Sequence, residues 1–205
     1  MTNPLLNTAY PVMEHFYTIQ GEGTHSGKAA YFIRLGGCDV GCVWCDVKDS
    51  WDATKHPQLT VQFLLQQVLA TPAKIVVITG GEPLMHNCHA LTNILQQNGI
   101  ATHIETSAAH PISGHWHWIC VSPKKFKAPL PTVVAQANEL KVVIFNKHDF
   151  VWAQQHALLC NPTCKLYLQP EWATANAVTP LIINYIKANP KWQLSLQVHK
   201  YINVP

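Results

Sequence analysis

The sequence predicts one α/β domain built on a mostly parallel sheet. The run 75–78 is continuously apolar, which is typical of a parallel strand that is buried on both faces. Strand-like and helix-like segments alternate with short connections, and this order favours parallel strands joined by right-handed crossovers. A chain of 205 residues suffices for one such domain with a sizeable core and is too short for two generous ones. No linker or internal repeat divides it, so 1–205 is expected to form a single domain.

The strands are predicted from their β-branched and aromatic residues and from the turns that end them. An extended segment over 10–17 precedes a glycine-rich turn at 20–23. Segment 28–35 is rich in Tyr, Phe and Ile, and 192–198 alternates between apolar and polar residues as a last strand. The remaining predicted strands are 74–79, 100–106, 116–121, 139–145 and 165–169.

Helices are predicted where apolar residues recur with a period of 3.6 residues. Thr60 can cap a helix over 61–69, in which the apolar residues fall at i, i+3, i+4, i+7 and i+8. A second, shorter helical face closes at Gly99. Thr179 and Pro180 match an N-cap followed by Pro at the first helical position, so the last helix is expected to begin there. The predicted helices are 61–69, a segment around 91–95, 148–158 and the segment that follows 179.

Composition limits the classes of partner. The net charge of +3 comes without a run of Lys and Arg, so nucleic-acid binding is not expected. The densest basic group, at 124–127, is explained as well by a site for a small anion. No apolar run approaches the roughly 20 residues that a membrane-spanning helix needs, so no membrane partner is expected. Hydrophobic content of 48% with 12% charged residues is a weak hint of a subunit interface.

Cysteine usage points to a reducing compartment. The chain has seven cysteines, an odd number, and starts without a basic and apolar leader, which favours a cytoplasmic location. Cys88 and Cys120 are interpreted as small buried residues. Cys160 and Cys164 are interpreted as ordinary loop or core thiols, because two cysteines without nearby partners fall short of a metal-ligand set.

Three thiols on a glycine-rich loop are the most informative feature. Cys38, Cys42 and Cys45 follow the predicted strand 28–35 with the spacing C-x3-C-x2-C. Structural zinc sites use four nitrogen or sulfur ligands, and [4Fe–4S] electron carriers use four thiolates. Three close ligands therefore indicate an iron–sulfur cluster with one iron left open to bind something else. A zinc site completed by a distant cysteine or by one of the twelve histidines is the alternative.

The same spacing, with an aromatic residue before the last cysteine, resembles the signature of the radical S-adenosylmethionine (SAM) superfamily. Three further motifs, at 17–23, 79–83 and 197–201, together resemble the 7-carboxy-7-deazaguanine synthases of queuosine biosynthesis. The resemblance covers nearly the whole chain. It implies a partial, reduced β/α barrel whose C-terminal tail closes the substrate site, a homodimer, and an external one-electron reductant such as flavodoxin.

The activity that the resemblance implies is that of a carbon–nitrogen lyase. A [4Fe–4S] cluster on Cys38, Cys42 and Cys45 would bind SAM and yield a radical. That radical would start the ring contraction of 6-carboxy-5,6,7,8-tetrahydropterin to 7-carboxy-7-deazaguanine, with loss of ammonia and with SAM acting catalytically. The protein would hold the abstracted hydrogen close to the radical and exclude water.

The candidate SAM residues fall at the carboxyl ends of the predicted strands, where ligands bind in α/β sheets. Segment 80–83 taken alone predicts a strand-ending turn. After the cysteine motif it resembles the segment that holds the methionine amine, with Glu82 supplying charge, and the strand end 105–107 falls at the same edge. The residues that the resemblance assigns to SAM are Trp44, Asp46, Gly81, Glu82, Ser122, Pro123, Lys124, Gln169, Pro170 and Glu171.

The candidate substrate residues include one charge in an apolar strand. Arg34 is interpreted either as half of a structural salt bridge or as a bidentate clamp on a substrate carboxylate. Gln20 and Glu22 offer an amide and a carboxylate that suit the donor and acceptor edge of a pterin. The terminal carboxylate of Pro205 can fold back toward the strand ends. The residues that the resemblance assigns to the substrate are Ile19, Gln20, Gly21, Glu22, Arg34, Thr79, His199 and Pro205.

Position 47 departs from the family pattern. The family usually has Thr there, whose hydroxyl helps to hold a Mg²⁺ beside the substrate, but this chain has Val47. A valine has no oxygen to offer, and Mg²⁺ prefers an octahedral shell of oxygens. The ion is therefore expected to be absent or to be held by substrate, Asp46 and water alone.

Two other function classes stay open at this stage. One is a different radical SAM enzyme, such as a glycyl-radical activase, which shares the cysteine spacing and segment 80–83 but is not expected to carry the motif at 20–23 or the terminal His-Lys pair. The other is a non-enzymatic zinc or iron–sulfur binding protein. Iron and sulfide content, with a visible spectrum, distinguishes the zinc protein from the rest.

Overall fold

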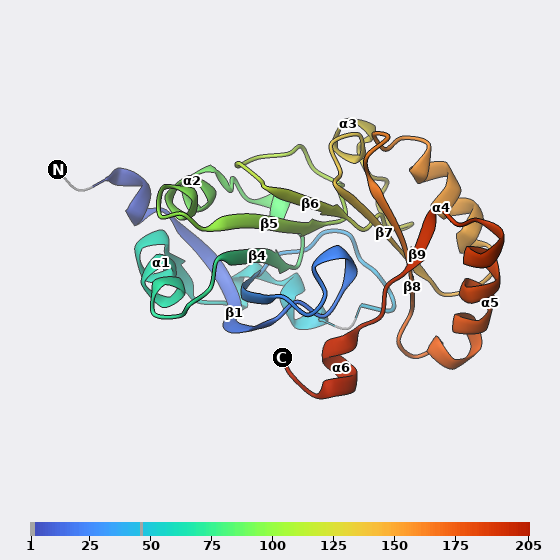
Figure 1. Cartoon of the computed structure of the whole chain (residues 1–205). Coiled ribbons are helices and arrows are strands. Elements are labelled where there is room, and N and C mark those ends of the chain that lie inside the picture. Colours follow the sequence, from blue (N-terminus) through green and yellow to red (C-terminus); the bar gives the residue numbers. More distant parts are fainter. Residues whose placement is uncertain (1–2, 46) are drawn as a thin grey trace.

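The fold is organised by one curved sheet. The computed structural model describes residues 3–45 and 47–205, which form a nine-stranded sheet in the order β3-β1-β2-β4-β5-β6-β7-β8-β9 (Figure 1). Strands β2 and β4 to β9 are parallel, whereas β1 pairs antiparallel with both β2 and β3. The strands are β1 (Ala9–Ile19), β2 (Ala29–Leu35), β3 (Gln58–Thr60), β4 (Ile75–Gly80), β5 (Ala101–Thr106), β6 (Trp118–Val121), β7 (Glu139–Ile144), β8 (Lys165–Pro170) and β9 (Trp192–Leu194).

Four helices, α1, α2, α4 and α5, pack on the sheet, and the predicted α/β class with a mostly parallel sheet is confirmed. In Figure 1, α1 and α2 lie at one end of the sheet and α4 and α5 at the other. The helices are α1 (Val61–Leu69), α2 (His89–Gln97), α3 (Pro131–Val134), α4 (Asp149–Ala157), α5 (Ala175–Ala188) and α6 (Val198–Ile202). No helix in the described part of the chain combines the length and apolar character needed to cross a bilayer.

The two faces of the parallel strands carry different residues because side chains alternate along a strand. On β2 and β4, Ile33 and Ile78 point toward α1 and α2 and belong to one apolar cluster. On β7, Leu140 belongs to a second cluster under α4 and α5. The neighbouring residues Arg34 and Lys141 point to the opposite, inner face. The helices therefore bury the apolar face and leave the inner face for polar groups.

Two predicted elements are wrong in their bounds. The last helix does not begin at Pro180: α5 starts at Ala175 and contains Pro180 in its interior. The carboxylate of Glu171 accepts hydrogen bonds from the backbone N–H groups of Ala173 and Thr174, and these satisfied donors let the chain turn earlier. The second error is the strand 192–198.

That last strand ends at Leu194, and the chain then leaves the sheet. Ser195 accepts a hydrogen bond from the N–H of Gly23 at 3.0 Å, and the N–H of Val198 donates to the carbonyl of Gly21 at 2.9 Å. The N–H of Ser195 still donates to the carbonyl of Leu168 on β8, and after Ser195 the contacts with the loop that follows β1 replace this pairing. The alternating sequence carried no information about this competing partner.

Local signals explain several elements that were predicted correctly. The Thr60 hydroxyl accepts from the N–H of Phe63 at 3.2 Å and caps α1 as expected. Gly80, at the end of β4, has φ +114°, and a Cβ there would lie 2.3 Å from the carbonyl oxygen of Leu35. Only glycine fits this combination of backbone angle and close approach, so β4 ends where the sequence breaks.

We expect the core beneath α4 and α5 to dominate stability. Leu168 is fully buried in that cluster, so Leu168→Ala should lower the free energy of unfolding by about 2–5 kcal/mol through lost burial and a residual cavity. Leu158→Ala is the matched control, since Leu158 is 81% exposed and should change stability by less than about 0.5 kcal/mol. Denaturant unfolding followed by circular dichroism measures both, and equal losses would contradict this assignment of the core.

Candidate active site

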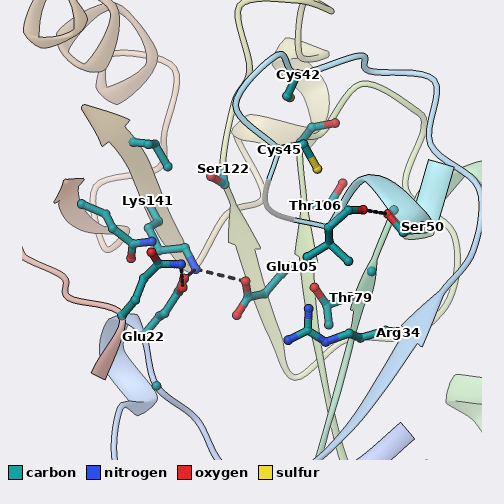
Figure 2. A pocket seen from close by; sticks show the side chains of 18 of the residues that line it. Glu22, Arg34, Cys42, Cys45, Ser50, Thr79, Glu105, Thr106, Ser122 and Lys141 are labelled. Carbon is teal, nitrogen blue, oxygen red and sulfur yellow. Dashed lines mark hydrogen bonds and ion pairs between the residues drawn. The ribbon is translucent and has the colours of Figure 1, made fainter. Parts of the chain in front are cut away.

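A cavity of about 250 Å³ opens at the carboxyl ends of the parallel strands. Its wall comes from the inner face of the sheet, from the cysteine loop and from the C-terminal segment (Figure 2). The predicted site residues that line it are Ile19, Gln20, Gly21, Glu22, Arg34, Cys38, Cys42, Trp44, Cys45, Val47, Thr79, Gly81, Glu82, Ser122, Lys124, Gln169, Pro170, Glu171, His199 and Pro205. Pro123 is buried but lies outside this wall, and Asp46 lies outside the described residues.

The three motif cysteines share one side of the cavity. All are free thiols; Cys38 and Cys45 pack against a small cluster that contains Cys42. Burial, together with the neighbouring thiols, raises the pKa of Cys42 to about 11, although the nearby Lys124 ammonium acts in the opposite direction. The Cys42 thiol is therefore protonated at neutral pH, and metal binding must displace that proton. In residues 3–45 and 47–205, no group of three or more His, Cys, Asp or Glu side chains is placed to hold a metal ion.

The other four cysteines lie away from this loop. Cys88 and Cys120 are buried, 0% and 4% exposed, as expected from their interpretation as small core residues. Cys160 and Cys164 are half-buried against the cluster under α4 and α5. None of the four lines the cavity.

Segment 80–83 is both a turn and part of the cavity wall. The N–H of Glu82 donates to the carbonyl of Gly37 at 2.8 Å, and a Cβ on Gly81 would lie 2.1 Å from that same oxygen. The Glu82 carboxylate is 1% exposed and accepts from Thr106 Oγ1 at 2.6 Å and from Ser107 N–H at 2.8 Å. The segment is therefore clamped to the cysteine loop, with a buried negative charge beside it.

Lys124 brings a positive charge to the opposite wall. Its ammonium donates to Ser122 Oγ at 2.5 Å and lies 5.5 Å from the centre of the Trp44 ring. Burial lowers the pKa of Lys124. Beside it, Gln169 accepts a hydrogen bond from Ser195 at 2.7 Å. An ammonium, a hydroxyl and an indole thus face the space next to the thiols.

Arg34 forms the structural salt bridge that was one interpretation of this residue, and its geometry remains compatible with the other, a clamp on a substrate carboxylate. Its Nε lies 3.1 Å from Oε1 of Glu14, an ion pair that is close in distance but not aligned as a hydrogen bond. The guanidinium also lies over the Phe16 ring at 5.6 Å. Figure 2 shows Arg34 beside Thr79, its neighbour in the β2–β4 register, at the edge of the cavity. The salt bridge is real, and the terminal nitrogens are left for a ligand.

The floor of the cavity holds charges that the sequence analysis missed in part. Lys141 on β7 contacts Glu22 and, at 3.0 Å, Glu105 (Figure 2). Gln20 donates to Glu105 at 2.9 Å, and Gln197 donates to Glu22 at 3.0 Å. We call these five residues the floor network. Lys141 and Gln197 were not predicted, and Glu105 was noted only for its place at a strand end. The signal for Lys141 was available, because it is a charge within an apolar strand.

The C-terminal segment packs directly on the loop after β1. A Cβ on Gly21 would lie 2.2 Å from Nδ1 of His199, so only glycine lets the two segments approach this closely. Pro205 also lines the cavity. The predicted substrate residues at the two ends of the chain are therefore brought to one place.

The wall at position 47 offers little to a cation. The carbonyl of Val47 accepts a hydrogen bond from the Ser50 hydroxyl at 2.6 Å. Both residues line the cavity. The Ser50 hydroxyl is thus already engaged with the backbone.

Comparisons with known proteins agree with the motifs. Residues 19–118 match the family described as a 4Fe-4S single cluster domain. The chain is 51% identical to the 7-carboxy-7-deazaguanine synthase of Flavobacterium psychrophilum over 195 residues, which covers 95% of this chain and 92% of that protein. It is 48% identical to the enzyme of the same name from Synechocystis, covering 98% and 96%. The crystal structure of QueE from Escherichia coli is similar with a TM-score of 0.85 at 32% identity, covering 97% of this chain and all of that one.

We expect the three cavity thiols to be needed for iron–sulfur binding. After anaerobic reconstitution, Cys42→Ser should lose most of its iron, its sulfide and its visible absorbance, because one thiolate ligand is gone. Cys160→Ser is the matched control, since Cys160 lies outside the cavity wall, and it should load like the parent. Iron and sulfide analysis per chain measures this. Equal iron and sulfide contents in both variants would show that the cluster is not bound by this loop.

Proposed function

The chain belongs to the 7-carboxy-7-deazaguanine synthase family, and we propose that the cavity at the carboxyl ends of its strands is where it carries out that family's reaction. The chain is a radical SAM enzyme of queuosine biosynthesis. It converts 6-carboxy-5,6,7,8-tetrahydropterin to 7-carboxy-7-deazaguanine and releases ammonia. The other classes, a glycyl-radical activase or a metal-binding protein, are not favoured by these relatives. The main support for this site is that the cysteine loop, Arg34 and the loop at 20–22 line one cavity.

Cys38, Cys42 and Cys45 would hold the cluster through three thiolates. The donor set fits, because three free thiols line one cavity and leave one iron of a [4Fe–4S] cluster without a cysteine. With SAM at that iron, the bound group supplies the radical that abstracts hydrogen from the substrate. The close packing of Gly81 on Gly37 keeps the cysteine loop against the strand ends.

SAM would lie between the thiols and the strand ends. The Lys124 ammonium suits the methionine carboxylate, and the buried charge of Glu82 lies where an amine would be attracted. Because Thr106 and Ser107 already donate to Glu82, its charge rather than a free oxygen is what it offers. The proposed SAM residues are Trp44, Asp46, Gly81, Glu82, Ser122, Pro123, Lys124, Gln169, Pro170 and Glu171. Pro123, outside the wall, would act only by holding its neighbours.

The substrate would be held at both of its ends. Arg34 is the only arginine in the sequence, and its terminal nitrogens suit a carboxylate, since a planar guanidinium binds one bidentately. Gln20 and Glu22 would read the pterin edge. The C-terminal segment would close the cavity through His199 and Pro205. The proposed substrate residues are Ile19, Gln20, Gly21, Glu22, Arg34, Thr79, His199 and Pro205.

Three finer points belong to the same proposal. Val47 supplies no side-chain ligand for Mg²⁺, so the ion would be dispensable or be held by substrate, Asp46 and water. A homodimer and an external one-electron reductant such as flavodoxin are expected from the family. Seven free cysteines support a reducing, cytoplasmic compartment.

The first test is an anaerobic assay of the iron- and sulfide-reconstituted protein with the pterin, SAM and a strong reductant, without and with Mg²⁺. We expect the deazapurine acid, identified by mass, without net consumption of SAM. Equal rates in both arms would show that Val47 has made Mg²⁺ dispensable. Cleavage of SAM with the pterin intact would keep the superfamily and reject the substrate. Absence of both reactions would reject the function.

Arg34→Lys should weaken binding of the substrate carboxylate. Lysine keeps the charge but loses the two-pronged geometry, so the KM for the pterin should rise about tenfold or more. The KM for SAM in the same variant is the internal control and should be unchanged. Steady-state kinetics with each substrate varied in turn separates the two. An increase in both constants would indicate a general loss of structure instead of a carboxylate clamp.

A further inference from the structure

Lys141 is the cation at the centre of the floor network. Its side chain is 4% exposed, and its ammonium contacts both Glu22 and Glu105, whose side chains are 13% and 23% exposed. Two carboxylates and one ammonium leave the floor with one net negative charge. Because burying charge without a partner is costly, removing the ammonium would leave two partly buried carboxylates without their shared cation and with their mutual repulsion.

The titratable groups around Lys141 come from several strands and from α6. The groups that face the pair of Lys141 and Glu22 are Glu105 on β5, Cys120 on β6, Glu139 on β7, Lys124 after β6 and His199 on α6. Burial alone would raise the pKa of Glu22, but the ammonium and hydrogen bond of Lys141, with the hydrogen bond from Gln197, outweigh burial and lower that pKa to about 2. Glu22 is therefore ionised at any physiological pH, and Lys141 is the main cause.

The hydrogen bonds of the network leave acceptor capacity toward the cavity. In Glu22, one oxygen accepts from Gln197 and the other from Lys141; in Glu105, one accepts from Gln20 and the other from Lys141. A carboxylate offers about four acceptor positions, so each oxygen keeps one. Both side chains line the cavity. The unfilled positions suit a ring that presents neighbouring N–H donors.

We propose that Lys141 is a positioning residue for substrate recognition, which holds Glu22 and Glu105 as two oriented acceptors for the N–H donors of the pterin ring. The inference rests on the proposed function, because it takes the pterin as the ligand of this cavity. In this role Lys141 acts through the two carboxylates, which take two of its three N–H donors. Gln20 holds one oxygen of Glu105, and Gln197 holds one oxygen of Glu22. Lys141 binds the other oxygen of each carboxylate and so sets the spacing between the two carboxylates.

Loss of Lys141 has a characteristic pH signature. In Lys141→Met the burial of Glu22 remains while its cationic partner is gone, so the pKa of Glu22 must rise. While it is protonated, the carboxyl ceases to be a full acceptor. Raising the pH through the higher pKa removes that proton, so pterin affinity of the variant should recover relative to the parent as the pH rises from 6 to 9. A purely structural role for Lys141 gives no such recovery.

The experiment is equilibrium binding of the pterin to the anaerobic, cluster-loaded protein by calorimetry, without reductant, at several pH values. Lys141→Met should raise the pterin Kd about tenfold to a hundredfold at pH 7, and the ratio to the parent should shrink as pH rises. Lys141→Arg, which keeps the charge, should recover most of the affinity. Lys74→Met is the matched control at an exposed lysine and should bind like the parent.

The double variant Glu22→Gln/Lys141→Met tests whether Lys141 acts through the carboxylate. Its Kd should equal that of Glu22→Gln and should not depend on pH through this site. Should Lys141→Met not fold, the pair Glu105→Gln and Glu105→Gln/Lys141→Met gives the same comparison with one buried charge less. Unchanged affinity, or a loss that is the same at every pH, overturns the inference. A parent protein that binds the pterin but does not convert it rejects the proposed function instead and leaves this comparison intact.

Discussion

Burying a charge without a partner is costly, and this cost decides what the inner face of the sheet can carry. The outer face is apolar and is covered by helices, so all the charge on the strands that shape the cavity is on the other side. There, Lys141 is met by Glu22 and Glu105, and Arg34 is met by Glu14. These ion pairs reduce the free-energy cost of burying charged groups at the strand ends. The same pairs leave acceptor oxygens and guanidinium nitrogens available, so stability and recognition use the same contacts.

The partners in these contacts are far apart in the sequence, which makes the site a product of the whole fold. Glu22 and Gln197 lie at opposite ends of the chain, yet they share a hydrogen bond of 3.0 Å. Gly23 is equally constrained: its φ is +62°, and a Cβ would lie 1.9 Å from a carboxylate oxygen of Glu139 on β7. The loop after β1 is thus fixed from below by β7 and from the side by the C-terminal segment. Both supports reach this loop only once the sheet and the C-terminal segment have formed.

Features of the fold and the site could be predicted from the sequence where they depend on neighbouring residues, and could not where they depend on residues far apart in the chain. The apolar run of β4 and the Thr60 cap are local features, and both predicted their elements correctly. The cysteine spacing is local too, and it indicated the radical SAM superfamily, while the motifs at 17–23, 79–83 and 197–201 indicated the family that the relatives support. By contrast, α5 begins early because Glu171 accepts hydrogen bonds from Ala173 and Thr174 in the turn that leads into the helix, and the last strand ends early because a distant loop competes for the chain. The partners of Lys141 come from two other elements, so a sequence pattern shows the charge but not what it holds.

The C-terminal segment is synthesised last, and this affects when the cavity is completed. Folding begins during synthesis from the N-terminal side, so the cysteine loop and the first parallel strands emerge long before residues 195–205. Until those residues arrive, the 20–23 loop has no partner on that side, because its contacts with Ser195 and Val198 are not yet formed. The side of the cavity that this segment covers is therefore the last to be built. Before that, the three thiols of the cysteine loop lie in a cavity that is still open on the side of the C-terminal segment.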